Sequence, residues 1–142
     1  MGVEVIGQQA FAGRWAVGRV MTDLGGGPDG RFTGTALFEP RGPSCLTYLE
    51  EGQLVLGEVP PMAASRRYIW TFSARRVAVS FGDGRPFHSF QLGVSGAGSD
   101  HLCGEDLYRV SYDFEAWPVW SVQWHVTGPR KNYAMLTHYA RC

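Results

Sequence analysis

The sequence lacks an excess of charge of either sign. Thirteen Lys and Arg residues balance thirteen Asp and Glu residues across 142 positions. A protein that binds nucleic acid through its phosphates needs a surplus of basic side chains, so we expect no nucleic-acid partner. No stretch approaches the roughly 18 apolar residues of a membrane-spanning helix. Residues 1–25 also lack the basic start and continuous apolar run of a secretion signal. We therefore expect no membrane partner either.

Cysteine is scarce. Cys45, Cys103 and Cys142 are odd in number, widely spaced and free of any C-x-x-C pattern, which argues against a disulfide framework and against a zinc knuckle. This usage is typical of a reducing compartment, so the sequence predicts a soluble cytoplasmic protein. His101 and Cys103 have a spacing that one strand can offer to a metal, but a zinc site needs more protein ligands than these. We predict no metal site and no cofactor.

Internal repeats, low-complexity segments and linkers are also absent, so we predict one domain over residues 1–142. What the chain does have is Gly, Pro and Asp in short clusters such as LGGGPDG, EPRGPS and TGPRKN, which are typical of turns. Segments rich in Val, Thr, Tyr, Phe and Trp lie between the clusters and favour strands. The predicted strands are residues 14–22, 31–39, 45–56, 62–73, 75–82, 86–93, 101–114, 118–127 and 131–141.

These strands and short turns predict an all-β fold. Such connections leave no room for crossover helices, so neighbouring strands pair antiparallel, and a twisted sheet of this many strands tends to close on itself. The expected architecture is a single antiparallel up-and-down β-barrel of about nine or ten strands, with a short N-terminal helical turn from Val5 to Phe11. The Gly-rich segment GVSGAGSD, residues 93–100, is expected to be a mobile loop over one mouth of the barrel.

Alternation along the stretch HLCGEDLYRVSYDF, residues 101–114, predicts which side chains face the barrel interior. Successive residues of a strand point to opposite faces. As one continuous strand, the stretch carries most of its aromatic residues at even positions, so Asp106, Tyr108 and Tyr112 are expected to point inward, and His101 and Cys103 to face water. The apparent cluster of a histidine, a cysteine and acids is therefore not expected to form one site.

The same alternation elsewhere predicts an interior with many polar atoms. The predicted inward polar residues are Tyr48, Glu50, Arg66, Tyr68, His88, Asp106, Tyr108, Tyr112, Tyr133 and Tyr139. Each buried hydroxyl or charge needs a partner, so a barrel packed for stability alone would carry Leu, Ile and Val at these positions. The set favours a lined cavity over a solid core, and a barrel of this size can hold one small ligand.

The tripeptide Gly13-Arg14-Trp15, which opens the first strand, resembles the G-x-W signature of lipocalin and wider calycin barrels. In those families the Trp closes one end and stacks on a basic residue of the last strand, and the resemblance assigns that part to Arg141. The strings ASRRYIW, DGRPFHSF, HLCGEDLYRVSYDF and GPRKNY, together with GRW, resemble the bacterial DUF6314 domain of unknown function. This resemblance covers nearly the whole chain and implies a calycin-like barrel. It carries over no catalytic residue, because the family has none assigned.

These observations lead to a binding hypothesis. We expect the barrel to hold a small amphipathic or aromatic molecule, and the protein to be a monomer or a homodimer. The expected ligand-binding residues are Arg66, Tyr68, Trp70, His88, Phe90, Asp106, Tyr108, Tyr112 and Tyr133. Aromatic rings would enclose the apolar part of the ligand, and Arg66, His88 and Asp106 would hold its polar or anionic end.

Three alternatives stay open from the sequence. In the first, the protein is an enzyme in which His88 and Asp106 act as a catalytic acid/base pair for proton transfer or hydration, although the same residues would also serve as a buried structural pair. In the second, an inward His88 or His138 is the axial ligand of a haem. In the third, the barrel has a solid interior and acts as an interaction module without a ligand.

Overall fold

The computed structural model describes residues 6–142, and strands make up most of this segment. One 3-10 turn, η1 (Gln8–Ala10), precedes them and confirms the middle of the predicted helical turn, whose first residue Val5 lies outside the described residues. The strands are β1 (Gly13–Asp23), β2 (Gly30–Pro40), β3 (Cys45–Leu56), β4 (Met62–Ser73), β5 (Arg76–Phe81), β6 (Pro86–Gln91), β7 (Gly96–Ala97), β8 (His101–Cys103), β9 (Asp106–Asp113), β10 (Trp120–Thr127) and β11 (Asn132–Arg141). Between residues 6 and 142, no helix has the length and apolar character to cross a membrane.

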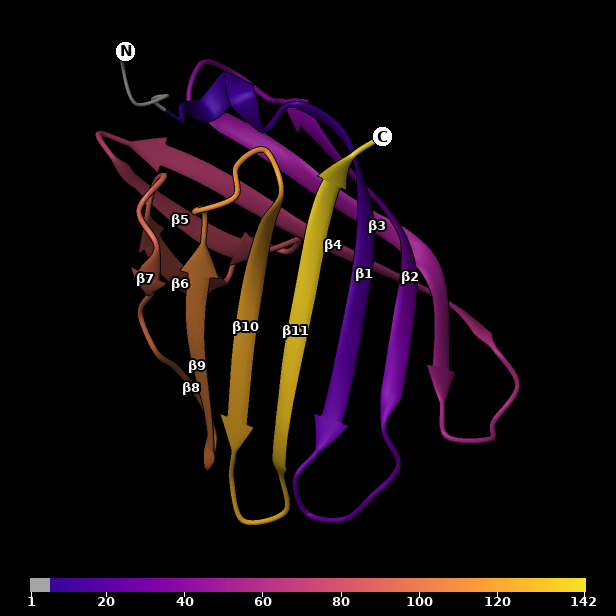
Figure 1. Ribbon diagram of the computed structural model, residues 1–142. Helices are drawn as coiled ribbons and strands as arrows, with labels where there is room; N and C mark the ends of the chain where they lie inside the picture. Colours follow the sequence, from indigo (N-terminus) through magenta and orange to yellow (C-terminus); the bar gives the residue numbers. More distant parts are fainter. Residues whose placement is uncertain (1–5) are drawn as a thin grey trace.

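All the strands belong to one sheet with antiparallel pairing (Figure 1). Strands β1 to β6 pair in chain order, and β9, β10 and β11 form a second run. The two runs join where β1 pairs with β11, from Trp15 opposite Arg141 to Asp23 opposite Tyr133. Because the first and last long strands are neighbours, the sheet curls into the predicted antiparallel barrel, which is nearly closed.

The remaining gap of the barrel lies between β6 and β9, and residues 96–99 fill it. The Gly98 N–H donates to the carbonyl oxygen of Val110 in β9 at 3.0 Å, and the Ser99 N–H donates to that of Ser89 in β6 at 2.8 Å. The Ser89 N–H in turn donates to the Ser99 hydroxyl oxygen at 2.8 Å. The segment predicted to be a mobile loop over a mouth is instead part of the barrel wall, because its backbone groups bond to a strand on each side.

Figure 1 shows η1 and the C-terminus at the same end of the barrel. Buried aromatic rings pack together at this end and close it. The fully buried Phe11 ring lies within 6.5 Å of the rings of Trp15, Trp70 and Trp120. Trp15 Nε1 donates to the Phe11 carbonyl oxygen at 2.8 Å. The Arg141 guanidinium lies 3.9 Å from the centre of the Trp15 ring, which confirms the partner that the G-x-W resemblance assigned to it.

The stretch 101–114 is two strands, not one. Gly104, with φ +61°, and Glu105 form a two-residue turn between β8 and β9, a position at which glycine adopts the left-handed conformation without strain. Residues paired across this turn share a face, and His101 lies opposite Tyr108. The prediction that His101 faces water is therefore wrong, since His101 is half-buried, whereas Cys103 is exposed as predicted. Leu102, which the alternation placed inside, is 68% exposed.

A β-bulge in β6 makes a second exception to the alternation. Val79 of β5 pairs with His88, but the next residue, Ser80, pairs with Pro86. Phe87 is the extra residue, so it escapes the alternation and faces the interior together with its neighbour His88. In β3 and β11 the alternation holds, since the predicted inward residues Tyr48, Glu50 and Tyr139 are buried.

The seam at residues 96–99 gives a first prediction. A Cβ at Gly98 would lie 2.7 Å from the Ser89 carbonyl oxygen and 2.8 Å from Val110 Cγ1, closer than real side chains approach. We expect Gly98→Ala to lower the free energy of unfolding by about 1–3 kcal/mol, the usual cost of overpacking. Urea unfolding followed by tryptophan fluorescence measures the change. Gly18→Ala in β1 is the control, since a Cβ there meets no atom within 4 Å, and equal losses in the two variants would contradict the prediction.

Candidate functional site

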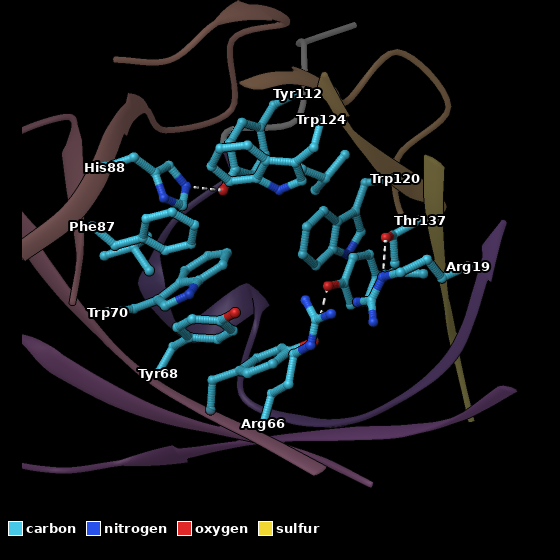
Figure 2. A pocket seen from close by; sticks show the side chains of 14 residues that line it. Arg19, Arg66, Tyr68, Trp70, Phe87, His88, Tyr112, Trp120, Trp124 and Thr137 are labelled. Carbon is cyan, nitrogen blue, oxygen red and sulfur yellow. Dashed lines mark hydrogen bonds between the residues drawn. The ribbon is translucent and has the colours of Figure 1, made fainter. Parts of the chain in front are cut away.

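Two connected chambers lie between the aromatic closed end and the opposite, open end of the barrel. The inner chamber, seen in Figure 2, has a volume of about 50 Å³ and the outer chamber about 360 Å³. The inner chamber is lined by Arg19, Tyr48, Arg66, Tyr68, Trp70, Val79, Phe87, His88, Tyr112, Trp120, Val122, Trp124, Thr137 and Tyr139. The outer chamber is lined by Met21, Arg66, Tyr68, Phe81, Phe87, His101, Cys103, Tyr108, Trp124, Tyr133 and Met135. Arg66, Tyr68, Phe87 and Trp124 line both, so they form the neck between the chambers.

A buried ion pair stands at one side of the inner chamber. Arg19 of β1 donates from Nη1 and Nη2 to the two carboxylate oxygens of Glu50 in β3, at 2.8 and 2.7 Å. Arg19 Nε donates to the Thr137 hydroxyl of β11 at 2.8 Å. The Tyr48 hydroxyl donates to Glu50 Oε1 at 2.5 Å and lies 2.9 Å from that of Tyr139. These bonds link three strands of the wall and satisfy the buried charges.

The protonation states of this network follow from its contacts. Burial alone would lower the pKa of Arg19 and raise that of Glu50, but their mutual hydrogen bonds and charges outweigh it, so the pKa of Arg19 is raised and that of Glu50 is lowered. Burial raises the pKa of Tyr139 to about 12 and holds that of Tyr48 well above its ordinary value. At neutral pH the network therefore contains one cation, one anion and two neutral phenols.

His88 lies on the far side of the inner chamber from Arg19 (Figure 2). Its Nε2 is 2.7 Å from the Tyr112 hydroxyl, and its Nδ1 is buried and has no hydrogen-bond partner among residues 6–142. Burial lowers the pKa of His88 to about 3, and the nearby charge of His101 acts in the same direction. The imidazole is thus neutral at physiological pH. The Phe90 ring stacks 3.9 Å behind Tyr112 and fixes the phenol toward His88.

Arg66 and Tyr68 of β4 leave two hydrogen-bond donors available at the neck. Both side chains line the inner chamber, and Figure 2 shows the guanidinium and the hydroxyl pointing into it. Arg66 is exposed and Tyr68 is half-buried. Within residues 6–142, the Arg66 guanidinium and the Tyr68 hydroxyl have no hydrogen-bond or ion-pair partner. Arg66 acts on Glu50, its neighbour across the ladder, through its charge alone.

The outer chamber has flat aromatic walls. The Phe87 ring stacks on Trp124 at 4.9 Å with an interplanar angle of 1°, and on Phe81 at 4.6 Å. The His101 ring meets Phe87 edge to face at 5.1 Å, and it meets Tyr108 at 5.8 Å. Ring faces of this kind favour a flat apolar guest, because stacking adds to the burial of apolar surface.

Most of the residues predicted from the sequence to bind a ligand line one of the chambers. The residues in this group are Arg66, Tyr68, Trp70, His88, Tyr108, Tyr112 and Tyr133. Phe90 does not line a chamber; it supports Tyr112 from behind. Whether any of these side chains touches a ligand stays a prediction.

Asp106 is the other exception, and the geometry does not bring it to His88. Its carboxylate forms an ion pair with Lys131 Nζ at 3.0 Å and is 22% exposed. It lies six residues along β9 from Tyr112, the partner of His88, or about 20 Å of extended strand. The predicted acid/base pair of His88 and Asp106 is therefore not formed.

The residues do not fit a haem. His88 Nε2 is engaged by Tyr112 and its Nδ1 is buried, so neither nitrogen is presented to an axial position. His138, the other candidate ligand, is exposed on the outer face of β11 because Thr137 and Tyr139 take the inward positions. The inner chamber of about 50 Å³ is also far smaller than a porphyrin.

Sequence reasoning missed Arg19 as well as His101 and Phe87. A signal for Arg19 existed, since it follows Trp15 by four residues in β1 and therefore shares the inward face. His101 would have been found from the Gly104-Glu105 dipeptide, whose first position suits a two-residue hairpin turn. The bulge that turns Phe87 inward has no comparable sequence signal.

The burial of His88 predicts a specific pH dependence of stability. Its pKa is 6.5 in an ordinary environment and about 3 in the fold, so between these values the unfolded chain binds a proton that the folded chain does not. The free energy of unfolding should therefore fall as the pH drops below 6.5, by on the order of 2 kcal/mol at pH 5. Glu50 contributes little at pH 5, because the stability gained from its lowered pKa is lost only as the pH falls through its ordinary value of 4.5 and below.

Urea unfolding of the wild type and of His88→Gln at pH 7 and pH 5 measures this effect. Glutamine keeps a polar group near the Tyr112 hydroxyl but has no proton to gain in this range. The variant should lose most of the decrease between the two pH values. A decrease of the same size in both proteins would assign the pH dependence to other groups.

Comparison with solved structures shows the same fold in proteins of very different sequence. The S-type phycobiliprotein lyase CPES from Guillardia theta superposes with a TM-score of 0.67 at 7% identity, over 94% of this chain and 89% of that one. A protein of unknown function from the DUF3598 family of Nostoc punctiforme has a TM-score of 0.62 at 12% identity. The match covers 98% of this chain, which spans about half (51%) of the length of that protein.

A fluorescence-activating β-barrel designed de novo has a TM-score of 0.50 at 15% identity, over 98% of this chain and 100% of that one. No functionally curated protein matches the sequence. The sequence does match the family of unknown function DUF6314 over residues 11–141, which is nearly its full length. With the barrel and its G-x-W closure in place, the chain belongs to the DUF6314 family.

Proposed function

We propose that this protein binds a small amphipathic or aromatic molecule inside its barrel. The observation that carries the proposal is the outer chamber of about 360 Å³, which has aromatic walls and joins a smaller polar chamber through a neck. A barrel that served stability alone would fill this volume with aliphatic side chains. The closed end of the same barrel is filled, by rings packed edge to face.

The chamber sizes suggest how such a molecule would lie. Ligand pockets are commonly about 300–1,000 Å³, so the outer chamber suits a molecule of one or two rings. The inner chamber has room for about one or two water molecules or for one small functional group. The apolar body would therefore occupy the outer chamber, and a polar end would reach through the neck.

The aromatic residues of the proposed site would enclose the body of the ligand. Tyr108 and Tyr133 line the outer chamber, Trp70 and Tyr112 line the inner one, and Tyr68 lies between them. The occurrence of the same fold in a phycobiliprotein lyase and in a designed fluorescence-activating barrel is in keeping with this proposal. The cytoplasmic location and the monomeric or dimeric state stay predictions of the sequence.

Native mass spectrometry of the freshly purified protein, beside its denatured mass, tests the proposal. We expect a reproducible extra mass that is lost on denaturation. Cys103→Trp should abolish it, because Cys103 lines the outer chamber and the larger side chain would fill that space. Leu102→Trp is the matched control, since the adjacent Leu102 points to solvent from the same strand.

Thermal unfolding with a library of small aromatic compounds provides the second readout. A compound that binds the folded barrel raises its melting temperature to an extent that grows with concentration and affinity, and it should do so in Leu102→Trp but not in Cys103→Trp. A bare chain in the native spectrum, together with no thermal shift from any compound, would contradict ligand binding.

A further inference from the structure

The side chains that line the two chambers carry an uncompensated positive charge. Within residues 6–142, no Asp or Glu lines either chamber. The charge of Arg19 is balanced by the carboxylate of Glu50, which accepts hydrogen bonds from both of its terminal nitrogens. Lys131 and Asp106 balance each other outside the chambers. Arg66 at the neck is left with no carboxylate within ion-pair distance among the described residues.

The donors at the neck match a planar anion. A guanidinium presents parallel N–H groups that suit the two oxygens of a carboxylate, and a phenol adds one further donor. Arg66 and Tyr68 lie two residues apart on the inner face of β4, and both point into the same space (Figure 2). Between residues 6 and 142, no acceptor satisfies either group.

The shape of the cavity fixes the orientation of such a guest. A carboxylate-sized group fits the inner chamber of about 50 Å³, whereas a ring system requires the outer chamber of about 360 Å³. The stacked Phe87 and Trp124 rings at the neck give a flat molecule one wall to lie against. The anionic end therefore points inward, and the aromatic body stays toward the open end.

We infer that the ligand is an aromatic carboxylate whose anionic group bonds with Arg66 and Tyr68 at the neck of the cavity. The inference rests on the proposed function and narrows it to one chemical class. The Arg66 guanidinium would repel a cationic ligand of the same shape, and a neutral ligand would gain no charge-assisted hydrogen bond from it.

Three probes of similar shape and different charge test the inference. Isothermal titration calorimetry at pH 7 compares 2-naphthoate, 2-naphthamide and 2-naphthylmethylammonium, so the anion, the neutral molecule and the cation share one ring system. The carboxylate should bind about ten- to hundredfold more tightly than the amide, the range typical of a hydrogen bond to a charged group. The ammonium should show no binding.

Two variants and one control locate the effect. Arg66→Gln should remove the advantage of the carboxylate and leave the affinity for the amide nearly unchanged. Tyr68→Phe keeps the ring and should weaken the carboxylate alone. Arg67→Gln is the matched control, because Arg67 is the intervening residue of β4 and is exposed like Arg66, but lines neither chamber. It should keep the wild-type order of affinities.

The outcomes separate this inference from the proposed function. Equal affinity for the three probes would overturn the inference, and so would a preference for the carboxylate that persists in Arg66→Gln. In either case, binding of the ring system would still support the proposed function. If none of the probes binds and the native mass spectrum shows a bare chain, both are overturned.

Discussion

The ion pair between Arg19 and Glu50 is the constraint around which the interior of the barrel is arranged. Two buried charges are stable there because each is fully bonded, and removing one partner would leave the other uncompensated in a medium of low polarity. Glu50 already accepts three hydrogen bonds, two from Arg19 and one from Tyr48. Its demand for donors is therefore met from β1 and β3, and Arg66, which lies opposite Glu50 in the ladder, remains free to face the cavity. The same pair that stabilises the wall thus determines which basic group is available to a guest.

The two ends of the barrel use the same residue types for different purposes. At the closed end, rings such as Phe11, Trp15 and Trp120 meet at steep angles and fill the space between the strands. Toward the open end, Phe87 and Trp124 lie parallel and line a chamber that they do not fill. The polar network separates these regions, because its buried hydroxyls and charges cannot be covered by an apolar core without losing their partners. The contrast between a filled end and a hollow end supports a binding role better than aromatic content does.

The barrel and most of its inward residues could be predicted because long strands such as β4 obey simple alternation, which placed Arg66, Tyr68 and Trp70 on one face. Alternation failed where the backbone departs from a straight strand. Across a two-residue turn, facing residues differ in parity, so His101 and Tyr108 share a face although one number is odd and the other even. The bulge at Phe87 inserts one extra residue into β6, so the alternation of inward and outward residues shifts by one position there. Alternation cannot predict which buried acid pairs with which base, because such pairs depend on contacts between strands that are distant in the sequence.

The seam formed by residues 96–99 also determines the size of the barrel. The sheet does not close by direct pairing of β6 with β9; a short piece of the chain stands between them as a spacer, bonded to each by its backbone. Barrel diameter grows with the number of strands in the circumference, so this spacer makes the barrel wider than direct closure would allow. It also covers the exposed edges of two strands that would otherwise be templates for aggregation. The width of the cavity is therefore set in part by a segment that contributes no side chain to either chamber.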